Sequence, residues 1–253
     1  MDIQDNVVLV TGGTSGLGLA AARRLASDGA LVVFLGRPSE RAEKAAADLG
    51  SRGVFVPGDV TRTEDLARAV DTAASLGRLG ALVSCAGIAV PGRTLGRQGP
   101  LPLEQFEEVV RVNLLGTFDA VRLAAGAMAA NDPVDGDRGV IVCTSSIAAY
   151  EGQEGQTAYA ASKAAVAGMT LPLARDLARH GIRVVTVAPG LFDTPMVAGL
   201  ADEARASLTA QTPHPVRLGR GEEFASLVAH VIENPMLNGE VIRLDGAVRL
   251  GPI

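Results

Sequence analysis

Short apolar segments alternate with longer, alanine-rich amphipathic segments along this chain of 253 residues. Seven of the short segments are nearly continuous apolar runs, which is typical of strands that helices cover on both faces. They lie at residues 6–10, 31–35, 53–56, 81–85, 139–144, 182–187 and 240–243. Strands that alternate with helices indicate βαβ units. We therefore expect a single doubly wound α/β domain over residues 1–253, with a seven-stranded parallel sheet.

The longer segments predict helices between these strands. We expect helices at residues 16–27, 39–49, 103–130 and 157–179, and another that opens with a capping box at residues 61–64. The amphipathic spacing of the helix at 157–179 continues through Pro172, so we expect a bend there rather than an end. His230 lies in a further amphipathic stretch. Residues 91–102, 131–138 and 189–215 read as loops, and the last is the expected substrate lid.

The composition restricts the partners of this chain. A net charge of -5, with dispersed basic residues, does not favour a nucleic-acid surface. No stretch reaches the roughly 18 apolar residues that a membrane-spanning helix needs, and the first residues are acidic where a secretory signal is basic. Cys85 and Cys143 lie in apolar runs, where we expect buried thiols and no metal site. We expect a cytoplasmic protein that acts on small molecules.

A glycine-rich segment directly follows the first predicted strand. It reads Thr-Gly-Gly-Thr-Ser-Gly-Leu-Gly over residues 11–18 and leads into an alanine-rich helix. Glycines here allow a tight turn and let the backbone approach a pyrophosphate, which then lies at the positive end of the helix. An ordinary strand-to-helix turn is the alternative. The position between the first strand and the first helix favours a dinucleotide site in a Rossmann-type domain.

Tyr159 and Lys163 form the most informative polar pair. They lie four residues apart in a predicted helix, so both side chains leave the same face. A nearby ammonium lowers the pKa of a phenol, and we expect Tyr159 to exchange protons for this reason. Ser146 ends the fifth predicted strand, thirteen residues before Tyr159, where a hydroxyl can bind a carbonyl or an alcohol. Each residue alone is compatible with a structural role, but together they favour general acid–base catalysis.

These motifs resemble the short-chain dehydrogenase/reductase family. The family's glycine segment has the form Thr-Gly-x-x-x-Gly-x-Gly, and its serine and Tyr-x-x-x-Lys pair have the same spacing as here. The resemblance implies an oxidoreductase that transfers hydride between a nicotinamide cofactor and a secondary alcohol or ketone. It implies four catalytic residues, namely Asn113, Ser146, Tyr159 and Lys163. The implied cofactor-binding residues are Gly12, Thr14, Ser15, Gly16, Leu17, Gly18, Arg37, Asp59, Val60, Cys85, Ala86, Gly87, Tyr159, Lys163, Pro189, Gly190 and Thr194.

Two departures from the family pattern bear on the cofactor. The family has Asn-Asn-Ala-Gly after the fourth strand, whereas residues 84–87 read Ser-Cys-Ala-Gly, which weakens the asparagines' support of the strands. After the second strand, Arg37 stands near the position of an acid that would bind the ribose 2′-hydroxyl. An arginine can instead neutralise a 2′-phosphate, stack on adenine or face solvent. The expected cofactor is NAD(P): Arg37 favours NADP(H), and the resemblance favours NAD(H).

Several longer segments are similar to the 3-hydroxyacyl-CoA dehydrogenase type-2 group, which includes 17-beta-hydroxysteroid dehydrogenase type 10. The similar segments are residues 87–90, 138–141, 151–153, 169–172, 233–235 and 238–247. The resemblance implies oxidation of 3-hydroxyacyl-CoA, or reduction of 3-oxoacyl-CoA, by a homotetramer in fatty acid metabolism. The candidates for offsetting the charge of CoA are Arg93, Arg97, Arg205 and Arg217. The alternatives are a 3-oxoacyl carrier-protein reductase and, in another class, a non-catalytic nucleotide-binding scaffold.

Overall fold

A central parallel sheet organises the computed structural model, which describes residues 1–195 and 209–252. Within these residues the sheet has seven strands in the order β3-β2-β1-β4-β7-β8-β9, and every neighbouring pair is parallel. The strands are β1 (Val7–Thr11), β2 (Leu31–Gly36), β3 (Gly53–Pro57), β4 (Leu79–Ser84), β7 (Gly139–Thr144), β8 (Ile182–Pro189) and β9 (Val241–Leu244). The predicted seven-stranded α/β fold is confirmed.

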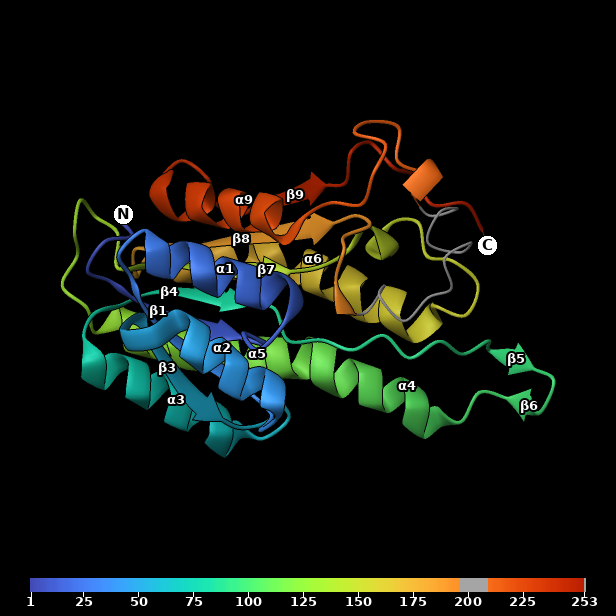
Figure 1. Ribbon diagram of the computed structural model, residues 1–253, viewed down its shortest axis with the longest axis horizontal. Helices are drawn as coiled ribbons and strands as arrows, with labels where there is room; N and C mark the ends of the chain where they lie inside the picture. Colours follow the sequence, from blue (N-terminus) through green and yellow to red (C-terminus); the bar gives the residue numbers. More distant parts are fainter. Residues whose placement is uncertain (196–208, 253) are drawn as a thin grey trace.

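Helices cover both faces of this sheet (Figure 1). On one face α1 packs directly beside α9, and α3 and α5 lie together on the other. The helices are α1 (Gly16–Ser27), α2 (Glu40–Leu49), α3 (Thr63–Leu76), α4 (Leu103–Val110), α5 (Gly116–Ala129), α6 (Thr157–Ala178) and α9 (Gly221–Glu233). Short 3-10 turns occupy Gly50–Arg52 and Ile147–Ala149. The strand order switches between β1 and β4, and folds of this kind bind ligands at the carboxyl edge of the sheet next to such a switch.

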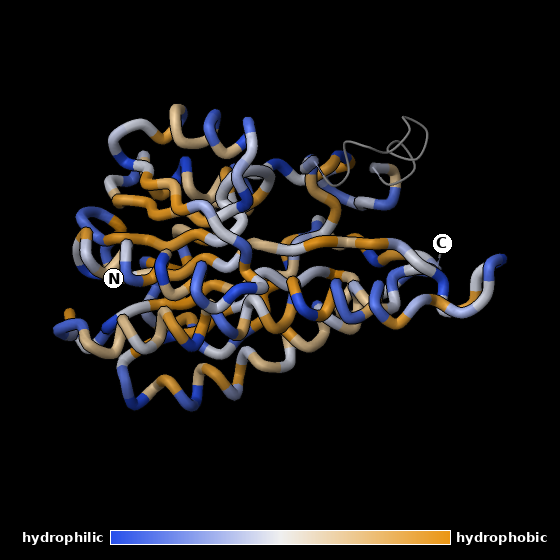
Figure 2. The backbone as a smooth tube through the Cα atoms, turned by 90° about the horizontal axis from the view of Figure 1, so that it is seen from below, coloured by the Kyte–Doolittle hydropathy of each residue, from blue (hydrophilic) through white to orange (hydrophobic). Residues whose placement is uncertain are grey.

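Alternate residues of each strand supply two separate apolar cores. Val8 and Val10 of β1 face the helices α1 and α9, whereas Val7 and Leu9 face α3 and α5. Figure 2 shows the resulting apolar interior between helices with more polar outer surfaces. Because both strand faces are covered, the strands contain few polar residues, which is why their apolar runs could be recognised in the sequence.

The predicted helix at residues 103–130 is interrupted. The chain forms α4 as far as Val110, then a π-helical turn at Arg111–Leu115, and then α5 from Gly116. A π turn adds a residue to the helical turn, and such turns often occur at functional sites. Asn113 lies inside this turn and is fully buried.

Three local expectations differ from the structure. The capping box at residues 61–64 does not form, because Thr61 gives its backbone N–H and its hydroxyl to the Asp59 carboxylate at 2.9 and 2.8 Å, and α3 begins at Thr63. The predicted loop 91–102 contains a small antiparallel hairpin, β5 (Leu95–Gly96) and β6 (Gly99–Pro100), at one end of the molecule (Figure 1). Strand β8 also extends to Pro189, further than predicted.

The predicted lid at residues 189–215 is described only at its two ends, because residues 196–208 lie outside the described part of the chain. Arg205 falls in that range. Helix α6 continues through Pro172 to Ala178, as predicted.

Candidate active site

The turn between β1 and α1, residues 11–18, is packed so tightly that side chains cannot enter it; we call it the glycine turn. Gly12 has a φ of +68°, and a Cβ atom there would lie 2.8 Å from the backbone of Ala86. A Cβ atom on Gly18 would lie 2.4 Å from the carbonyl oxygen of Gly12. The glycines therefore bring three backbone segments together and leave the amino end of α1 open to a ligand.

The remaining positions of the glycine turn have distinct roles. Ser15 is the N-cap residue of α1 and makes no side-chain cap hydrogen bond, while Leu17 packs on the apolar core. Gly16 has a φ of +54° and lies beside Thr194, to which an added Cβ atom would come within 3.7 Å. The turn thus meets the first residues after β8 at the carboxyl edge of the sheet.

A surface hollow lies next to the glycine turn, at the end of β2. It is lined by Thr14, Ser15, Arg37, Pro38, Ser39, Glu40 and Arg41. Arg37 is exposed, and Gly36 beside it leaves room for the Thr14 methyl group, which would lie 2.6 Å from an added Cβ atom. Ser39 caps the amino end of α2 by accepting a hydrogen bond from the Ala42 N–H at 3.3 Å. Two guanidinium groups and a helix amino end therefore surround this hollow.

Asp59 and Val60 follow β3 on the same edge of the sheet. The Asp59 backbone N–H donates to the Asp65 carboxylate at 2.9 Å, and the Asp59 side chain accepts from Thr61. Val60 is buried and packs against the start of α5, where a Cβ atom on Gly116 would lie 3.0 Å from it. Asp59 thus holds its own loop in place while it remains partly accessible.

Hydroxyl groups link the strands where the family has asparagines. The Ser84 hydroxyl lies 3.4 Å from that of Thr11 and donates to that of Thr117 at 3.5 Å. Thr11 in turn accepts a hydrogen bond from the Ala86 N–H at 3.3 Å. The expected loss of strand support is therefore made up by hydroxyls on β1, β4 and α5. Burial raises the pKa of the Cys85 thiol to about 11 and keeps it neutral at physiological pH.

Asn113 and Lys163 meet behind Gly87. A Cβ atom on Gly87 would lie 3.3 Å from Asn113 Oδ1 and 3.4 Å from Lys163 Nζ. The Asn113 amide accepts from the Ile88 N–H at 2.8 Å and donates to the Ile88 carbonyl at 2.9 Å and to Ser162 Oγ at 3.0 Å. All polar atoms of this side chain are thus used to connect the π turn, the segment after β4 and α6.

Lys163 is a buried cation held by the backbone. Its Nζ donates to the Thr144 carbonyl at 2.9 Å, and its own backbone carbonyl accepts from Ser145 Oγ at 2.7 Å. Burial lowers the pKa of Lys163 to about 8. Ser145 is occupied by this contact, whereas the half-buried Ser146 faces Tyr159, in agreement with the choice of Ser146 from the spacing.

Tyr159 lies between Ser146 and Lys163. Its ring centroid is 5.8 Å from Lys163 Nζ, and its phenol lies near enough to the Ser146 side chain for Ser146 to influence its pKa. Burial raises the pKa of Tyr159, and the nearby Ser146 hydroxyl only partly offsets this effect. The expected lowering by Lys163 is therefore not found, because the ammonium points to the Thr144 carbonyl instead. Tyr159 is a protonated phenol at neutral pH and is suited to donate a proton.

The end of β8 closes the other side of this edge. Pro189 is buried, and Gly190 gives its N–H to the Leu244 carbonyl at 2.9 Å. A Cβ atom on Gly190 would lie 2.7 Å from Asp245, so this glycine is required for close packing of β8 against the segment after β9. Thr194 then reaches the glycine turn. The predicted site residues thus lie along one edge of the sheet.

Residues 6–205 match the family described as short chain dehydrogenase. This match covers most of the chain and includes the glycine turn, Ser146, Tyr159 and Lys163. The chain belongs to the short-chain dehydrogenase family. As a member of this family it is an oxidoreductase with a nicotinamide cofactor, and the non-catalytic scaffold considered from the sequence is set aside.

Named relatives in the short-chain dehydrogenase family resemble this chain over nearly its whole length. The 3-hydroxyacyl-CoA dehydrogenase type-2 of Drosophila melanogaster is 52% identical over 99% of this chain and 100% of its own. That of Homo sapiens is 52% identical over 97% of this chain and 96% of its own. A crystal structure of 3-hydroxyacyl-CoA dehydrogenase type-2 from Mycobacterium avium aligns with a TM-score of 0.93 at 43% identity, covering 98% and 97% of the two chains.

The glycine turn fits the nicotinamide dinucleotide that this family uses. Cβ atoms at Gly12 and Gly18 would fill the space in which the backbone comes together, so only glycine leaves the backbone N–H groups accessible to phosphate oxygens. Several residues that support the site were not selected from the sequence. Ser162 and Ile88 hold Asn113, and the Thr144 carbonyl holds Lys163. These residues are small or act through the backbone, and neither property stands out in a sequence.

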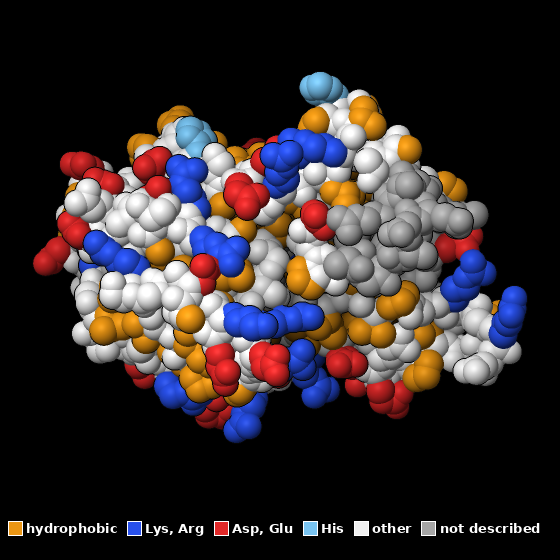
Figure 3. Space-filling model, in the orientation of Figure 1, with side chains coloured by type: hydrophobic (Ala, Val, Ile, Leu, Met, Phe, Trp, Pro, Cys, Tyr) orange, Lys and Arg blue, Asp and Glu red, His pale blue; other side chains and the backbone are white. Residues whose placement is uncertain are grey.

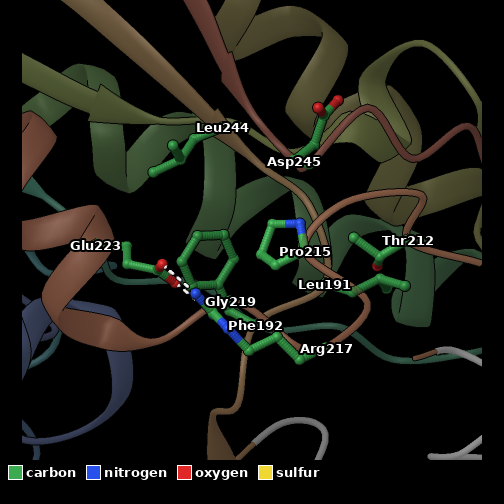
Figure 4. Close-up of a pocket in the computed structure, with 10 residues that line it drawn as sticks. Leu191, Phe192, Thr212, Pro215, Arg217, Gly219, Glu223, Leu244 and Asp245 are labelled. Atoms are coloured by element: carbon green, nitrogen blue, oxygen red, sulfur yellow. Dashed lines mark hydrogen bonds and ion pairs between the residues drawn. The ribbon is translucent and has the colours of Figure 1, made fainter. Parts of the chain in front are cut away.

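A partly open cavity of about 110 Å³ lies between the end of β8, the segment after β9 and the start of α9 (Figure 4). Its lining includes Leu191, Phe192, Thr212 and the Arg217–Glu223 ion pair, and none of the predicted catalytic residues. The buried Thr212 Oγ1 has no hydrogen-bond partner within the described residues. Because this lining lacks the predicted catalytic residues, Ser146 and Tyr159 remain the candidate active site.

Proposed function

We propose that this short-chain dehydrogenase interconverts 3-hydroxyacyl-CoA and 3-oxoacyl-CoA thioesters. The observation that carries the proposal is the near full-length similarity to enzymes named 3-hydroxyacyl-CoA dehydrogenase type-2. The grouping of Ser146, Tyr159 and Lys163 supports the chemistry, because a carbonyl oxygen placed between the two hydroxyls would receive hydrogen bonds from both.

The proposed catalytic roles follow from the contacts of each side chain. Ser146 orients the substrate oxygen, and Tyr159 donates a proton to it during reduction or accepts one during oxidation. Lys163 lies behind Tyr159 and supplies positive charge near both the phenol and the ribose position. Asn113 holds the π turn against Ile88 and Ser162, and so fixes the wall behind Lys163. When bound, the nicotinamide ring donates or accepts the hydride.

The protonated state of Tyr159 favours reduction at neutral pH. Burial raises the pKa of its phenol, so the proton needed by a developing alkoxide is already in place. Oxidation needs the deprotonated phenol, so we expect the rate of alcohol oxidation to rise with pH while the rate of reduction does not. Initial rates in both directions from pH 6 to pH 10 measure this.

The test of the substrate compares acetoacetyl-CoA with an uncharged short 3-oxo thioester and with an acetoacetyl carrier protein. Turnover of the carrier-protein thioester alone would favour the carrier-protein reductase, and turnover of none would refute the acyl proposal. Of the four arginines expected to offset the charge of CoA, three lie in the described part of the chain. Arg93 and Arg217 are paired with Glu154 and Glu223, whereas Arg97 is exposed at the hairpin tip and forms no ion pair with the described residues.

We infer from this charge arrangement that, among the three described arginines, Arg97 is the one most available to attract CoA. Lys and Arg side chains are otherwise interspersed with acidic ones over the face in Figure 3. If Arg97 attracts CoA, acetoacetyl-CoA should be preferred over the uncharged thioester at low salt and less so at high salt. An Arg97→Gln variant should lose that preference.

We propose NADP(H) as the cofactor on the evidence of Arg37. The guanidinium of Arg37, that of Arg41 and the amino end of α2 surround one hollow, which suits a ribose 2′-phosphate. Glu40 lines the same hollow and suits the 2′-hydroxyl of NAD(H), so the preference is expected to be moderate. The Arg37→Asp variant removes the cation and adds a repelling carboxylate.

We expect Arg37→Asp to shift the NADPH/NADH ratio of kcat/KM toward NADH by about tenfold or more. Lys44→Asp is the matched control, because Lys44 is an exposed cation on α2, the helix that follows Arg37, and does not line the hollow. An unchanged ratio in Arg37→Asp would show that Arg37 does not interact with the ribose.

We propose that this protein forms a homotetramer, as the resemblance to the 3-hydroxyacyl-CoA dehydrogenase type-2 group implies. Leu115 and Phe118 support it, because 56% and 46% of their surfaces are exposed next to one another at the start of α5. Light scattering tests this assembly.

The single domain, the substrate lid and the cytoplasmic location stay predictions. Among the described residues, no helix is long and apolar enough to cross a membrane, and no group of metal-binding side chains is found.

A further inference from the structure

The segment that joins Ser146 to Tyr159, residues 147–156, is held by the C-terminal end of the chain; we call it the serine–tyrosine loop. It begins with the 3-10 turn Ile147–Ala149 and ends at Gln156, directly before α6. Two proposed catalytic hydroxyls therefore stand at its two ends. Their separation depends on the shape of this loop.

Arg243 at the end of β9 makes the main contact with this loop. Its two terminal nitrogens donate to the two Glu151 carboxylate oxygens at 2.7 and 2.9 Å, and its Nε donates to Asp245 at 2.7 Å. The guanidinium also lies 5.3 Å from the ring centroid of Tyr150. These bonds lower the pKa of Glu151, so the pair stays ionised at neutral pH. Such a forked contact fixes direction as well as distance.

The last residues of the chain extend the contact along the loop. The Glu154 N–H donates to the Pro252 carbonyl at 3.0 Å, and the Gln153 amide donates to the Gly251 carbonyl at 3.2 Å. Arg249 lies 3.5 Å from Glu151 and 3.2 Å from Asp245. We call Glu151, Arg243, Asp245 and Arg249 the C-terminal clamp. The clamp and the two carbonyls hold three neighbouring residues of the loop.

The opposite side of the loop leaves little freedom to compensate. A Cβ atom on Gly152 would lie 2.9 Å from the Ala160 side chain, which is the residue after Tyr159. The Gly155 carbonyl accepts from the Gly92 N–H at 2.8 Å, which ties the loop to the segment before the hairpin. A shift of residues 151–154 is therefore passed to the first turn of α6 and to Tyr159.

We propose that Arg243 and Glu151 are positioning residues for catalysis, which set the distance between the Ser146 and Tyr159 hydroxyls through the serine–tyrosine loop. This inference rests on the proposed reaction at Ser146 and Tyr159. Neither residue touches the reacting atoms. Among the proposed cofactor-binding residues, Gly190 packs on Asp245 of the clamp, but Arg243 and Glu151 are part of neither the glycine turn nor the hollow at Arg37. We therefore expect loss of the Arg243–Glu151 contact to lower turnover and to leave dinucleotide binding nearly unchanged.

The test uses Arg243→Lys in the full-length protein, with acetoacetyl-CoA and NADPH or NADH as the assay. Lysine keeps the charge but cannot make the forked contact. We expect kcat to fall by about tenfold or more, because small misplacements of reacting groups are costly, while the Kd for the dinucleotide changes less than about twofold. Glu151→Gln is the second variant, since it is nearly isosteric and removes the same contact from the other side.

Arg183→Lys is the control for a purely structural loss. Arg183 is also a buried, fully bonded arginine, but it lies at the start of β8 and binds Asp137 and the carbonyls at the end of α9. We expect it to lower the Tm without lowering kcat per folded molecule. A fall in kcat with an unchanged dinucleotide Kd in both clamp variants, but not in Arg183→Lys, supports the proposal.

Two other outcomes overturn the inference. If both clamp variants keep wild-type kcat, or if they lose kcat and dinucleotide affinity together with Tm as a general loss of structure, Arg243 and Glu151 do not position the hydroxyls. Failure of the proposed function is distinguishable, because it appears in the wild-type enzyme as absence of turnover with every 3-oxoacyl thioester.

Discussion

The glycine turn and the serine–tyrosine loop both follow strands at the carboxyl edge of the sheet, but different forces hold them. The glycine turn is fixed by backbone packing, as the 2.4 Å approach of a Gly18 Cβ atom to the Gly12 carbonyl indicates. The serine–tyrosine loop is fixed by ion pairs with partners 92 residues away. The first arrangement is encoded locally, and the second depends on the completed fold.

This difference separates binding from turnover. Backbone N–H groups at the glycine turn are available only while the turn keeps its shape, so changes there should affect dinucleotide affinity. Changes around the serine–tyrosine loop should affect the hydroxyl groups and hence the chemical step. Three substitutions test this division, from the largest expected effect to the smallest.

Tyr159→Phe tests whether the hydroxyl groups at the serine–tyrosine loop serve the chemical step. It removes the proposed proton donor and little else, so kcat should fall between about a hundredfold and ten-thousandfold while the dinucleotide Kd stays nearly unchanged. Stopped-flow or steady-state rates and a fluorescence titration with the reduced cofactor measure the two quantities. Tyr150→Phe is the matched control at the other tyrosine, which is 52% exposed. Near wild-type turnover in Tyr159→Phe would contradict the assignment.

Lys163→Met tests the free-energy cost of burying the Lys163 ammonium. The pKa of Lys163 is lowered from 10.5 to about 8, so the native state disfavours the ammonium more than the unfolded state does. This cost is fully present below pH 8 and disappears as the pH rises toward 10.5, because there the native lysine is neutral while the unfolded lysine still binds a proton. The variant's gain in unfolding free energy over the wild type should thus shrink by about 2–3 kcal/mol from pH 7 to pH 10.

Urea unfolding at pH 7 and pH 10 measures that change. Lys44→Met serves as the control, because Lys44 is exposed and its variant should show the same difference from the wild type at both pH values. A pH-independent difference for Lys163→Met would show that burial does not perturb the lysine. Loss of turnover is expected as well, so stability and catalysis oppose each other at this position.

Gly18→Ala tests whether the shape of the glycine turn determines dinucleotide affinity. It has the smallest expected effect of the three substitutions. One added methyl group must displace the glycine turn, and we expect the dinucleotide Kd to rise by about tenfold while kcat at saturating cofactor changes little. Gly126→Ala is the control, since nothing lies within 4 Å of an added Cβ atom in the middle of α5. That variant should be more stable by up to about 1 kcal/mol. Equal affinity in both variants would mean that the turn does not bind the pyrophosphate.

The predictions from the sequence succeeded where structure depends on neighbouring residues. The helix at 16–27 and the strand at 139–144 have the predicted bounds, because apolar periodicity and glycine punctuation are local signals. The capping box at 61–64 failed because the Asp59 carboxylate competes for Thr61. The C-terminal clamp was not foreseen, since nothing near Glu151 in the sequence points to Arg243.

The sequence predicted which polar side chains of the candidate site lie together, but it did not predict how their pKa values shift. Spacing located Ser146, Tyr159 and Lys163, and the structure brings them together. The direction of the Tyr159 pKa was wrong, because it depends on burial and on where the Lys163 ammonium points. Neither quantity can be derived from spacing along a helix.

The π-helical turn at Arg111–Leu115 acts as a phase shift between two helices that lie end to end in Figure 1. One extra residue in a helical turn corresponds to a rotation of about 100°. Asn113 can therefore face Ile88 and Ser162 while Ala120 and Ala124 of α5 pack on the sheet. Deleting a single residue from this turn would rotate the buried side of α5 toward water. Asn113 and the buried side of α5 can therefore both point into the protein only because the π turn contains this extra residue.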